Sequence, residues 1–470
     1  MKVLLISPPA FKTIRGDSSD IFEEESGIYP PLGLMYIASY LKAHTDHSVE
    51  ILDTQANGLT YSEIENEIRR ISPDIVGITT LTFTLIDVIN IAKMARRIDG
   101  NIHICLGGPH VYIYPDETIR FPFVDSLVLG EGEIAFAELA DSLGENIPLN
   151  KVKGIVFKNG KEIVHTEPRE FNTDLDSLPF PERGMTPYKS YSSVLSKESL
   201  MTTMMTSRGC PFSCIYCHRP HMGKKYRTRS AVNVVDEMEE CANMGIREFM
   251  IFDDIFTLNR GRVFEVCKEI IDRRLDISWD IRSRVNTVDY EMLKQLKKAG
   301  CKRISYGIEA GTDKALKALK KGTTLKQSEE AIRMTKDLGI TTLADFMLGS
   351  PQEEREDILK TIDFALRLKP DFAQFTITTP YPATELYRLG LESGLIKDDY
   401  WKGFAEEPDS GFETPAWEEN LSREELFELL LLAYKRFYIR PGYIMKSLIK
   451  VRSFKELKKK MKAGLKVFKI

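Results

Sequence analysis

Three cysteines are crowded into one short part of the chain. The stretch TSRGCPFSCIYCHRP, residues 206–220, holds Cys210, Cys214 and Cys217, which are three of seven cysteines in 470 residues. Thiolates bind metal ions and metal clusters, and this spacing lets one loop present all three. Gly209 and Pro211 favour a loop over a continued helix. The stretch therefore predicts a loop that binds a metal ion or a cluster.

The residues alone leave three interpretations of this loop open. A structural zinc site takes four ligands, and His218 is poorly placed as the fourth because it directly follows Cys217. The three cysteines could also be small buried residues of a core. Cysteine thiolates hold iron–sulfur clusters, usually four at a time, so three ligands would leave one iron open. We favour the cluster.

The spelling CPFSCIYC, with an aromatic residue before the third cysteine, resembles the signature of the radical S-adenosylmethionine (SAM) superfamily. The resemblance covers roughly residues 200–381. It implies that the three cysteines ligate a 4Fe-4S cluster whose open iron chelates SAM. Such a cluster cleaves SAM to a 5'-deoxyadenosyl radical and takes its electron from a donor such as flavodoxin or ferredoxin. Further segments imply SAM contacts from later strand ends, by Asp253, Asp254, Arg284, Glu309, Gly349 and Pro351.

Arg282 and Arg284 alternate along one predicted strand, which places them on the same side of it. Either Arg284 clamps the SAM carboxylate or it pairs with a structural acid. The aspartates have an equally plain alternative as helix-capping residues at a strand end.

The elements that must position these residues are strands alternating with helices. From residue 200 onward we expect six strands, at 202–207, 248–254, 278–284, 303–309, 341–349 and 372–379. Six strand–helix units are too few for a closed eightfold barrel and suit a partial (β/α)6 barrel, which is also the architecture of the superfamily.

The first 145 residues alternate in the same way, with strands expected at 2–7, 48–53, 74–80, 102–108 and 126–130. This pattern predicts a parallel sheet with helices on both faces, and ligands in such sheets bind beyond the carboxyl ends of the strands. No G-x-G-x-x-G follows the first strand, so a dinucleotide is not expected. A hairpin with Asn159-Gly160 at its turn is expected at 152–168, before a proline-rich linker.

The order of these segments resembles the Rossmann-like cobalamin-binding domain that precedes the barrel in the cobalamin-dependent branch of the superfamily. The resemblance implies that the cobalamin lies against the strand ends. The residues concerned are Thr79, Thr80, Thr82, Gly107, Gly108, Gly130, Glu131 and Gly132. Ordinary strand-end capping and tight turns would explain the same residues.

No histidine follows the first strand as the lower ligand of cobalt. The resemblance thus implies cobalamin bound without a protein histidine on cobalt. His110 is the nearest alternative, although a single histidine at a strand end is more often a local hydrogen-bonding residue.

The two resemblances together imply an enzyme that methylates an unactivated carbon of a substrate, with SAM as radical source and methylcobalamin as methyl donor. A radical cyclisation, like that of the anaerobic magnesium-protoporphyrin monomethyl ester cyclases, is the alternative. A methylthiotransferase would need further cysteines in the first domain, where only Cys105 lies. A non-enzymatic iron–sulfur electron carrier normally supplies all four ligands and is a distant alternative.

Charge is uneven along the chain. The segment 434–470 has thirteen lysines or arginines and one acid, whereas the whole chain has a net charge of -4. This basic tail could touch an anionic membrane or form a solvated helix that packs on the barrel. The start of the chain lacks the apolar stretch of a signal peptide, and no segment has the about 18 apolar residues of a membrane span. A cytoplasmic protein with a small-molecule or lipid-like substrate and no nucleic-acid partner is expected.

We therefore expect four segments. These are a cobalamin-binding domain at 1–145, a hairpin and linker at 146–199, a radical SAM partial TIM barrel at 200–400, and a helical region with the basic tail at 401–470. The loop from Lys12 to Tyr29 is long enough to serve as a lid.

Overall fold

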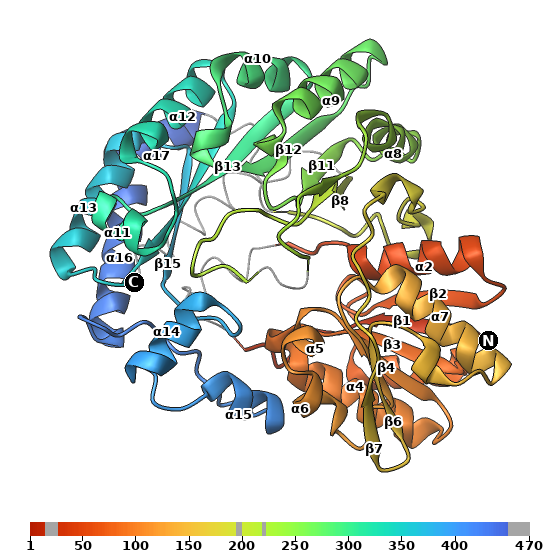
Figure 1. Cartoon of the computed structure of the whole chain (residues 1–470). Coiled ribbons are helices and arrows are strands. Elements are labelled where there is room, and N and C mark those ends of the chain that lie inside the picture. Colours follow the sequence, from red (N-terminus) through yellow and green to blue (C-terminus); the bar gives the residue numbers. More distant parts are fainter. Residues whose placement is uncertain (15–26, 194–199, 219–221, 450–470) are drawn as a thin grey trace.

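The structure is a computed structural model and describes residues 1–14, 27–193, 200–218 and 222–449. Two α/β domains follow one another along the chain (Figure 1), with the first domain in red to orange and the second in green to cyan. Most of the predicted lid from Lys12 to Tyr29, and residues 450–470 of the predicted basic tail, lie outside the described residues.

The first domain is built on a seven-stranded sheet with the order β2-β1-β3-β4-β5-β6-β7. Strands β1 to β5 run parallel, and β6 and β7 are antiparallel. The strands are β1 (Lys2–Ser7), β2 (Ser48–Asp53), β3 (Ile75–Thr79), β4 (His103–Gly107), β5 (Ser126–Val128), β6 (Ile155–Asn159) and β7 (Glu162–His165). All five parallel strands were predicted.

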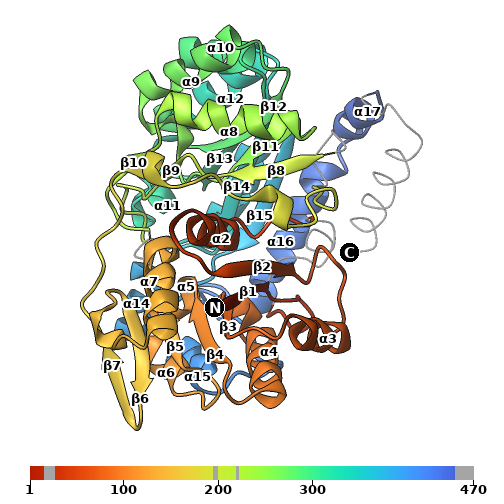
Figure 2. The same cartoon turned by 90° about the vertical axis from the view of Figure 1, so that its right-hand side faces the viewer.

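Helices cover both faces of this sheet because alternate residues of its strands are apolar on both sides. Leu4 and Ile6 of β1 pack with α3 and α4, whereas Val3 and Leu5 pack with α2 and α7. The helices are α2 (Leu32–His44), α3 (Tyr61–Ile71), α4 (Leu85–Ile98), α5 (Pro109–Ile113), α6 (Pro115–Ile119) and α7 (Gly132–Glu145). Figure 2 shows α2 between the first sheet and the second domain.

The predicted hairpin is confirmed, but the predicted domain boundary at residue 145 is too early. Strand β6 pairs antiparallel with β5, so the hairpin extends the first sheet. Strand β6 buries Val156 and Phe157 in the two cores of this domain. The first domain therefore ends after His165, and the linker begins there.

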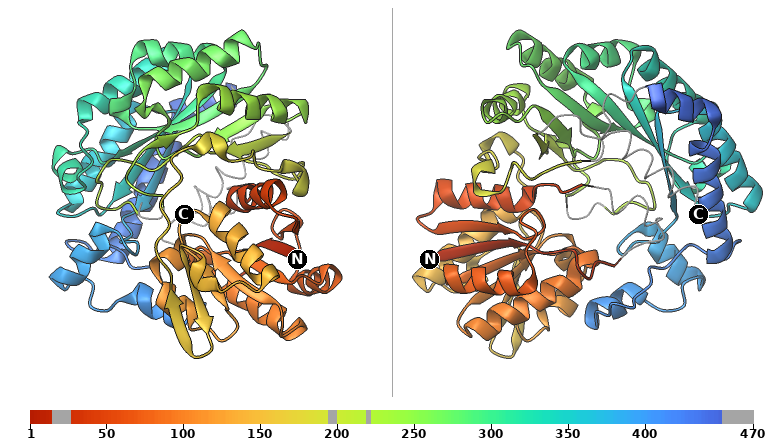
Figure 3. Two further views of the ribbon diagram at one scale, coloured as in Figure 1. Left: turned by 45° about the vertical axis from the view of Figure 1, so that its right-hand side comes forward. Right: turned by 180° about the vertical axis from the view of Figure 1, so that it is seen from behind.

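The second domain contains an open sheet of six parallel strands in the order β15-β14-β13-β12-β11-β8. The strands are β8 (Met201–Met204), β11 (Glu248–Ile251), β12 (Ser278–Ser283), β13 (Cys301–Glu309), β14 (Thr341–Leu348) and β15 (Phe372–Ile377). Each contains residues of one predicted strand, and β8 does not pair with β15. The expected partial barrel is confirmed. Figure 3, in its view from behind, shows the concave side of this sheet opening toward the first domain.

Helices pack on the convex side of the barrel sheet, where one apolar cluster joins them to the strands. They are α8 (Ala231–Asn243), α9 (Arg260–Asp272), α10 (Tyr290–Lys298), α12 (Leu325–Asp337) and α13 (Arg355–Leu368). The short α11 (Asp313–Ala318) lies between β13 and α12 along the chain. Cys241, Cys267 and Cys301 are buried in this cluster, as expected of core residues.

The C-terminal region is helical, as predicted, and contacts both domains. Its helices are α14 (Glu385–Ser393), α15 (Tyr400–Glu406), α16 (Arg423–Tyr438) and α17 (Pro441–Ile449). Helix α16 packs on β15, and α15 contacts α6 of the first domain. Among the described residues, no helix combines the length and the apolar character that a membrane crossing requires.

Candidate active site

The three cysteines of the predicted site lie in a loop at the carboxyl end of the first barrel strand. The loop leaves a two-residue strand, β9 (Ser207–Arg208), which pairs with β10 (Arg227–Thr228). Gly209 has a φ of 84°, and a Cβ there would lie 2.3 Å from the carbonyl oxygen of Lys225. Only glycine fits this approach. Cys210 and Cys214 are buried, and Cys217 is exposed.

The loop supplies three thiols, which is one ligand fewer than a structural zinc site takes. In the described ranges, no three side chains of His, Cys, Asp or Glu converge closely enough to hold one ion. The ligands of a cubane cluster each bind a different iron, so they need to surround the cluster and not to meet at a point. A loop with three thiols, two of them shielded from water, fits the cluster better than it fits zinc.

Arg284 lies against this loop. One of its terminal nitrogens is 3.4 Å from Sγ of Cys214, and its guanidinium lies 3.8 Å from the ring centroid of Phe212. The side chain is 5% exposed. Arg282 and Arg284 were predicted to lie on the same side of one strand. They do not, because β12 ends at Ser283 and Arg284 lies beyond it. Arg282 is exposed and lies over the ring of Phe252, 4.7 Å from its centroid.

Glu309 ends β13 next to the cysteine loop, as expected of a SAM contact. Its φ is 70°, and the pairing with β14 shifts register between Gly307 and Glu309. The carboxylate accepts hydrogen bonds from the hydroxyl of Tyr216 at 2.9 Å and from Nζ of Lys321 at 2.7 Å. Tyr216 is the aromatic residue just before the third cysteine. Sequence reasoning missed Lys321, which is only 5% exposed, because it follows a helix far from any recognised motif.

Gly307 makes room for this group. A Cβ at Gly307 would lie 2.4 Å from an oxygen of Glu309 and 2.9 Å from Nζ of Lys321. Burial raises the pKa of the Tyr216 hydroxyl well above its ordinary value, and the neighbouring Glu309 carboxylate adds to the rise. Tyr216 therefore stays protonated and donates to Glu309.

The concave side of the barrel sheet also presents Asp345 of β14. For the described residues, no hydrogen bond to its carboxylate is recorded, and it is partly exposed. Burial raises the pKa of Asp345 to about 7, Glu309 adds to the rise, and Arg282 and Lys321 oppose it. These four charged groups therefore share one space above the sheet.

Asp345 makes the stability of the protein depend on pH. Its ordinary pKa is 3.8, so between about pH 4 and 7 the folded chain holds a proton that the unfolded chain has lost. The free energy of unfolding therefore gains from this proton in full below pH 4, and the gain is lost as the pH rises through 7. Asp345→Asn should therefore be more stable than the wild type at pH 8, by about 2 kcal/mol after allowance for partial exposure. Urea unfolding at pH 5 and pH 8 measures this, and an equal difference at both pH values would contradict it.

Asp253 has a role other than the predicted one. Its two carboxylate oxygens accept four hydrogen bonds, from the backbone nitrogens and the hydroxyls of Thr206 and Ser207, at 2.6 to 3.0 Å. The side chain is 1% exposed. It fastens the strand that leads into the cysteine loop, so the prediction that it meets the SAM ammonium was wrong. Asp254 is exposed and remains a predicted SAM contact.

Gly349 also serves packing. Its φ is 76°, and a Cβ there would lie 2.5 Å from Cδ2 of Leu426 in α16. The glycine therefore lets α16 approach the end of β14. This packing explains the glycine without the predicted contact with SAM. Pro351 follows it, is partly exposed, and remains a predicted SAM contact.

The predicted cobalamin contacts of β3 and β4 lie together at the carboxyl edge of the first sheet. Gly108 has a φ of 105°, and a Cβ there would lie 2.9 Å from the carbonyl oxygen of Thr80. Thr80 and Thr82 are buried, and Thr82 binds Nδ1 of His110 at 3.0 Å. Thr79, Gly107 and Gly108 remain partly exposed at the edge.

His110 is enclosed by the protein and is not exposed at this edge. The side chain is fully buried, and burial lowers the pKa of its imidazole to about 3. It stays neutral and bonds to Thr82, which is the local role that the sequence suggested.

Two large apolar side chains that sequence reasoning missed, Phe11 and Leu81, are 56% and 46% exposed after β1 and β3. They are suited to cover a flat apolar ligand at this edge.

Glu131 joins the two domains and does not close the cobalamin pocket. Its carboxylate pairs with Arg208 at 2.8 Å and with Arg227 at 2.9 Å. Arg208 also binds Glu133 at 2.6 Å, and it directly precedes Gly209 of the cysteine loop. The prediction for Glu131 was therefore wrong, since a charge this far buried takes the nearest guanidinium. Gly130 is partly exposed, whereas a Cβ at Gly132 would lie 2.9 Å from Ile37 of α2.

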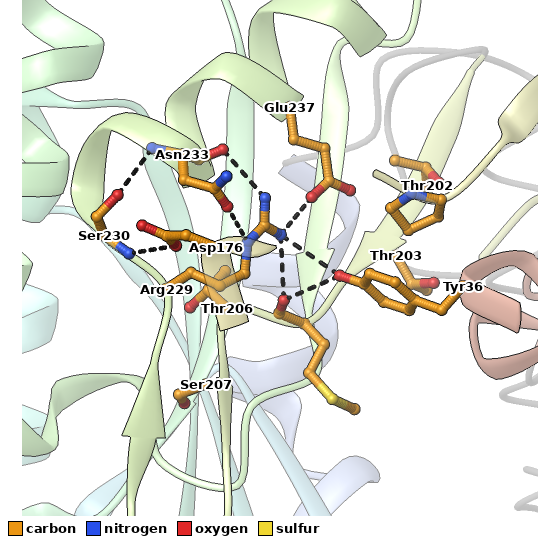
Figure 4. Close-up of polar contacts among 12 residues, drawn as sticks. Tyr36, Asp176, Thr202, Thr203, Thr206, Ser207, Arg229, Ser230, Asn233 and Glu237 are labelled. Carbon is orange, nitrogen blue, oxygen red and sulfur yellow. Dashed lines mark hydrogen bonds and ion pairs between the residues drawn. The ribbon is translucent and has the colours of Figure 1, made fainter. Parts of the chain in front are cut away.

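A second buried network lies where α2 meets the barrel (Figure 4). Glu237 of α8 is fully buried and binds Arg229, as Figure 4 shows. It also binds Arg183 at 2.5 Å. Arg229 also donates to Asn233 at 2.6 Å and to the hydroxyl of Tyr36 at 3.4 Å. Arg183 comes from the linker and Tyr36 from the first domain. Both networks therefore join the first domain to the barrel.

Two family models match this chain. The radical SAM superfamily model matches residues 204–365, and the B12 binding domain model matches residues 19–140. The first match contains the cysteine loop, Arg284 and Glu309, and the second contains the carboxyl ends of β2 to β5.

Curated relatives match over nearly the whole chain. An uncharacterised methyltransferase of Pyrococcus horikoshii is 35% identical over 97% of this chain and 96% of its own length. An anaerobic magnesium-protoporphyrin IX monomethyl ester cyclase of Rubrivivax gelatinosus is 30% identical over 95% of this chain and 80% of its own.

A solved structure shares the whole arrangement of domains. The cobalamin-dependent SAM radical enzyme OxsB, with aqua-cobalamin and SAM bound, superposes with a TM-score of 0.75. The match covers 99% of this chain and 72% of OxsB at 20% identity, so it shows a common fold.

Proposed function

Because the chain belongs to the radical SAM superfamily, in the branch that carries a B12-binding domain, we propose that it methylates a carbon atom of a small-molecule or lipid-like substrate. The family expected from the cysteine spacing and from the order of the first domain is thereby confirmed. The observation that carries the proposal is the presence of both family matches in one chain whose full-length relative is a methyltransferase.

Three groups of residues would hold the cofactors. Cys210, Cys214 and Cys217 offer three thiolates to a 4Fe-4S cluster, and Glu309, which binds Tyr216 of the same loop, offers its carboxylate to SAM. The carboxyl edge of the first sheet offers cobalamin small residues and the exposed Phe11 and Leu81. When bound, the cluster and SAM supply a carbon-centred radical, and cobalamin supplies the methyl group.

The residues of the chain would position the two cofactor sites and would shield the reacting substrate from water. The pairs of Arg208 with Glu131 and Glu133 tie the cysteine loop to the first sheet, so the two cofactor sites keep a constant separation. Met250, Phe252, Leu343 and Met347 are partly exposed and lie outside the helix-packed core. They line the concave side of the barrel sheet beside Asp345 and would keep water from a reactive substrate carbon.

This lining supports a substrate with an apolar body and one hydrogen-bond donor for Asp345. The electron would come from a reductant such as flavodoxin or ferredoxin. Membrane contact through the basic tail stays a prediction, since residues 450–470 lie outside the described part of the chain.

A second candidate is a radical cyclisation without methyl transfer. The observation that favours it is the 30% identity with the magnesium-protoporphyrin ester cyclase over 95% of this chain. A methylase of this type consumes SAM in two ways and yields both 5'-deoxyadenosine and S-adenosylhomocysteine. The cyclisation yields only 5'-deoxyadenosine from SAM.

The test is anaerobic purification of the full chain with hydroxocobalamin, followed by iron, sulfide and corrinoid analysis and by SAM turnover under reduction. We expect about four irons and about one corrinoid per chain, with both SAM products formed. 5'-Deoxyadenosine without S-adenosylhomocysteine would favour the cyclisation. Zinc in place of iron would overturn both candidates.

A further inference from the structure

Arg284 is a buried cation that contacts the cysteine loop. Its three nitrogens donate to Sγ of Cys214 at 3.4 Å, to Oδ1 of Asn286 at 3.3 Å and to the backbone carbonyl of Lys321. Its guanidinium carbon lies over the ring of Phe212, which lies between the first and second cysteines. Two of its contacts, those with Cys214 and Phe212, are therefore within the loop itself.

No carboxylate balances this charge. Along the described chain, Arg284 forms no ion pair with Asp or Glu, whereas the neighbouring Lys321 is paired with Glu309. A guanidinium remains protonated at every accessible pH, and a buried one is stable only beside negative charge. Its contact with Sγ of Cys214 would place it beside the negative charge of a cluster bound by this loop.

Three of the five N–H groups of Arg284 are already engaged, one on each nitrogen. A hydrogen bond to a ligand sulfur favours the reduced cluster, because reduction adds negative charge to the sulfurs. The effect is larger when the donor is charged and shielded from water.

On the basis of the proposed function, we propose that Arg284 is a positioning residue that holds the loop at Cys214 and raises the reduction potential of the cluster. It acts on the cluster through its hydrogen bond to a ligand and not through SAM. The low potential expected of such clusters is thereby brought within reach of a cellular reductant.

The test is a redox titration of the anaerobically reconstituted full chain without SAM, followed by electron paramagnetic resonance. In Arg284→Gln the ratio of reduced to oxidised cluster at a fixed ambient potential should fall about tenfold, which is about 59 mV for one electron. The midpoint potential of Arg284→Lys should lie between that of Arg284→Gln and that of the wild type. Arg282→Gln is the matched control, since it removes an equal charge two residues away without touching Cys214, and its midpoint should remain that of the wild type.

The outcomes separate the alternatives. A wild-type midpoint in Arg284→Gln, together with weakened SAM binding in an equilibrium titration, would assign Arg284 to SAM and overturn the inference. An equal shift of the midpoint potential in Arg282→Gln would mean that any lost positive charge nearby has this effect. That result would also overturn the inference. If Arg284→Gln failed to take up iron, Arg284→Lys would decide, and a wild-type midpoint there would contradict us. A wild type without a cluster would instead refute the proposed function.

Discussion

Replacing Cys210, Cys214 and Cys217 together by alanine is expected to abolish iron binding and SAM cleavage while cobalamin binding persists. The cysteine loop projects from the barrel, and the expected corrin site lies on strands of the first domain. Cysteine to alanine removes one sulfur atom from each side chain, and Cys217 is exposed. Formation of 5'-deoxyadenosine should fall by at least about 10³-fold, because no other thiols can replace these ligands.

Iron, corrinoid and 5'-deoxyadenosine are measured on the same anaerobic preparations. Cys267→Ala is the matched control, because Cys267 is 1% exposed within the barrel core. It should keep its iron and lose only about 1 kcal/mol of stability. Loss of corrinoid together with iron in the triple variant would show that the two sites are not independent. Retention of iron would refute the cluster.

Glu237→Gln is expected to destabilise the protein by about 3–5 kcal/mol, because it leaves two buried guanidiniums without a counterion. Glu237 is fully buried, and Arg183 and Arg229 are 3% and 4% exposed. Burial raises the pKa of the Glu237 carboxyl, but the two arginines outweigh burial and hold it below its ordinary value. The stabilisation is therefore present above pH 5 and is lost in acid as the carboxyl becomes protonated.

Urea unfolding at pH 7 measures the loss. Glu239→Gln is the control within the same helix, because its partner Arg273 and its own side chain are solvated. Exposed pairs contribute at most about 1 kcal/mol, so this variant should remain close to the wild type. A similarly small loss in Glu237→Gln would mean that water reaches the buried pair.

Much of the fold was predictable from the order of residues along the chain. Apolar runs separated by amphipathic segments predicted the five parallel strands of the first sheet and the six of the barrel, because each strand and helix buries its own periodic face. The hairpin at Asn159-Gly160 was predicted too, but its pairing with β5 was not. A hairpin is specified locally, whereas the sheet edge that it extends is specified by packing.

The candidate site divides in the same way. The cysteine spacing is a local property, and the loop was identified from it. Glu131 was assigned to cobalamin because it ends a strand, yet it pairs with Arg208, 77 residues away in the chain. Asp253 was assigned to SAM, yet it binds Thr206 and Ser207.

Which residues could supply thiolates to a cluster was thus settled along the chain, because three ligands within eight positions lie in one loop in any fold. Which charged groups serve binding and which serve structure was settled only by the tertiary structure. A carboxylate or guanidinium removed from water must take the partner that packing brings within about 3 Å. Lys321 beside Glu309, and Arg284 beside Cys214, have such partners, and no spacing in the sequence reveals them.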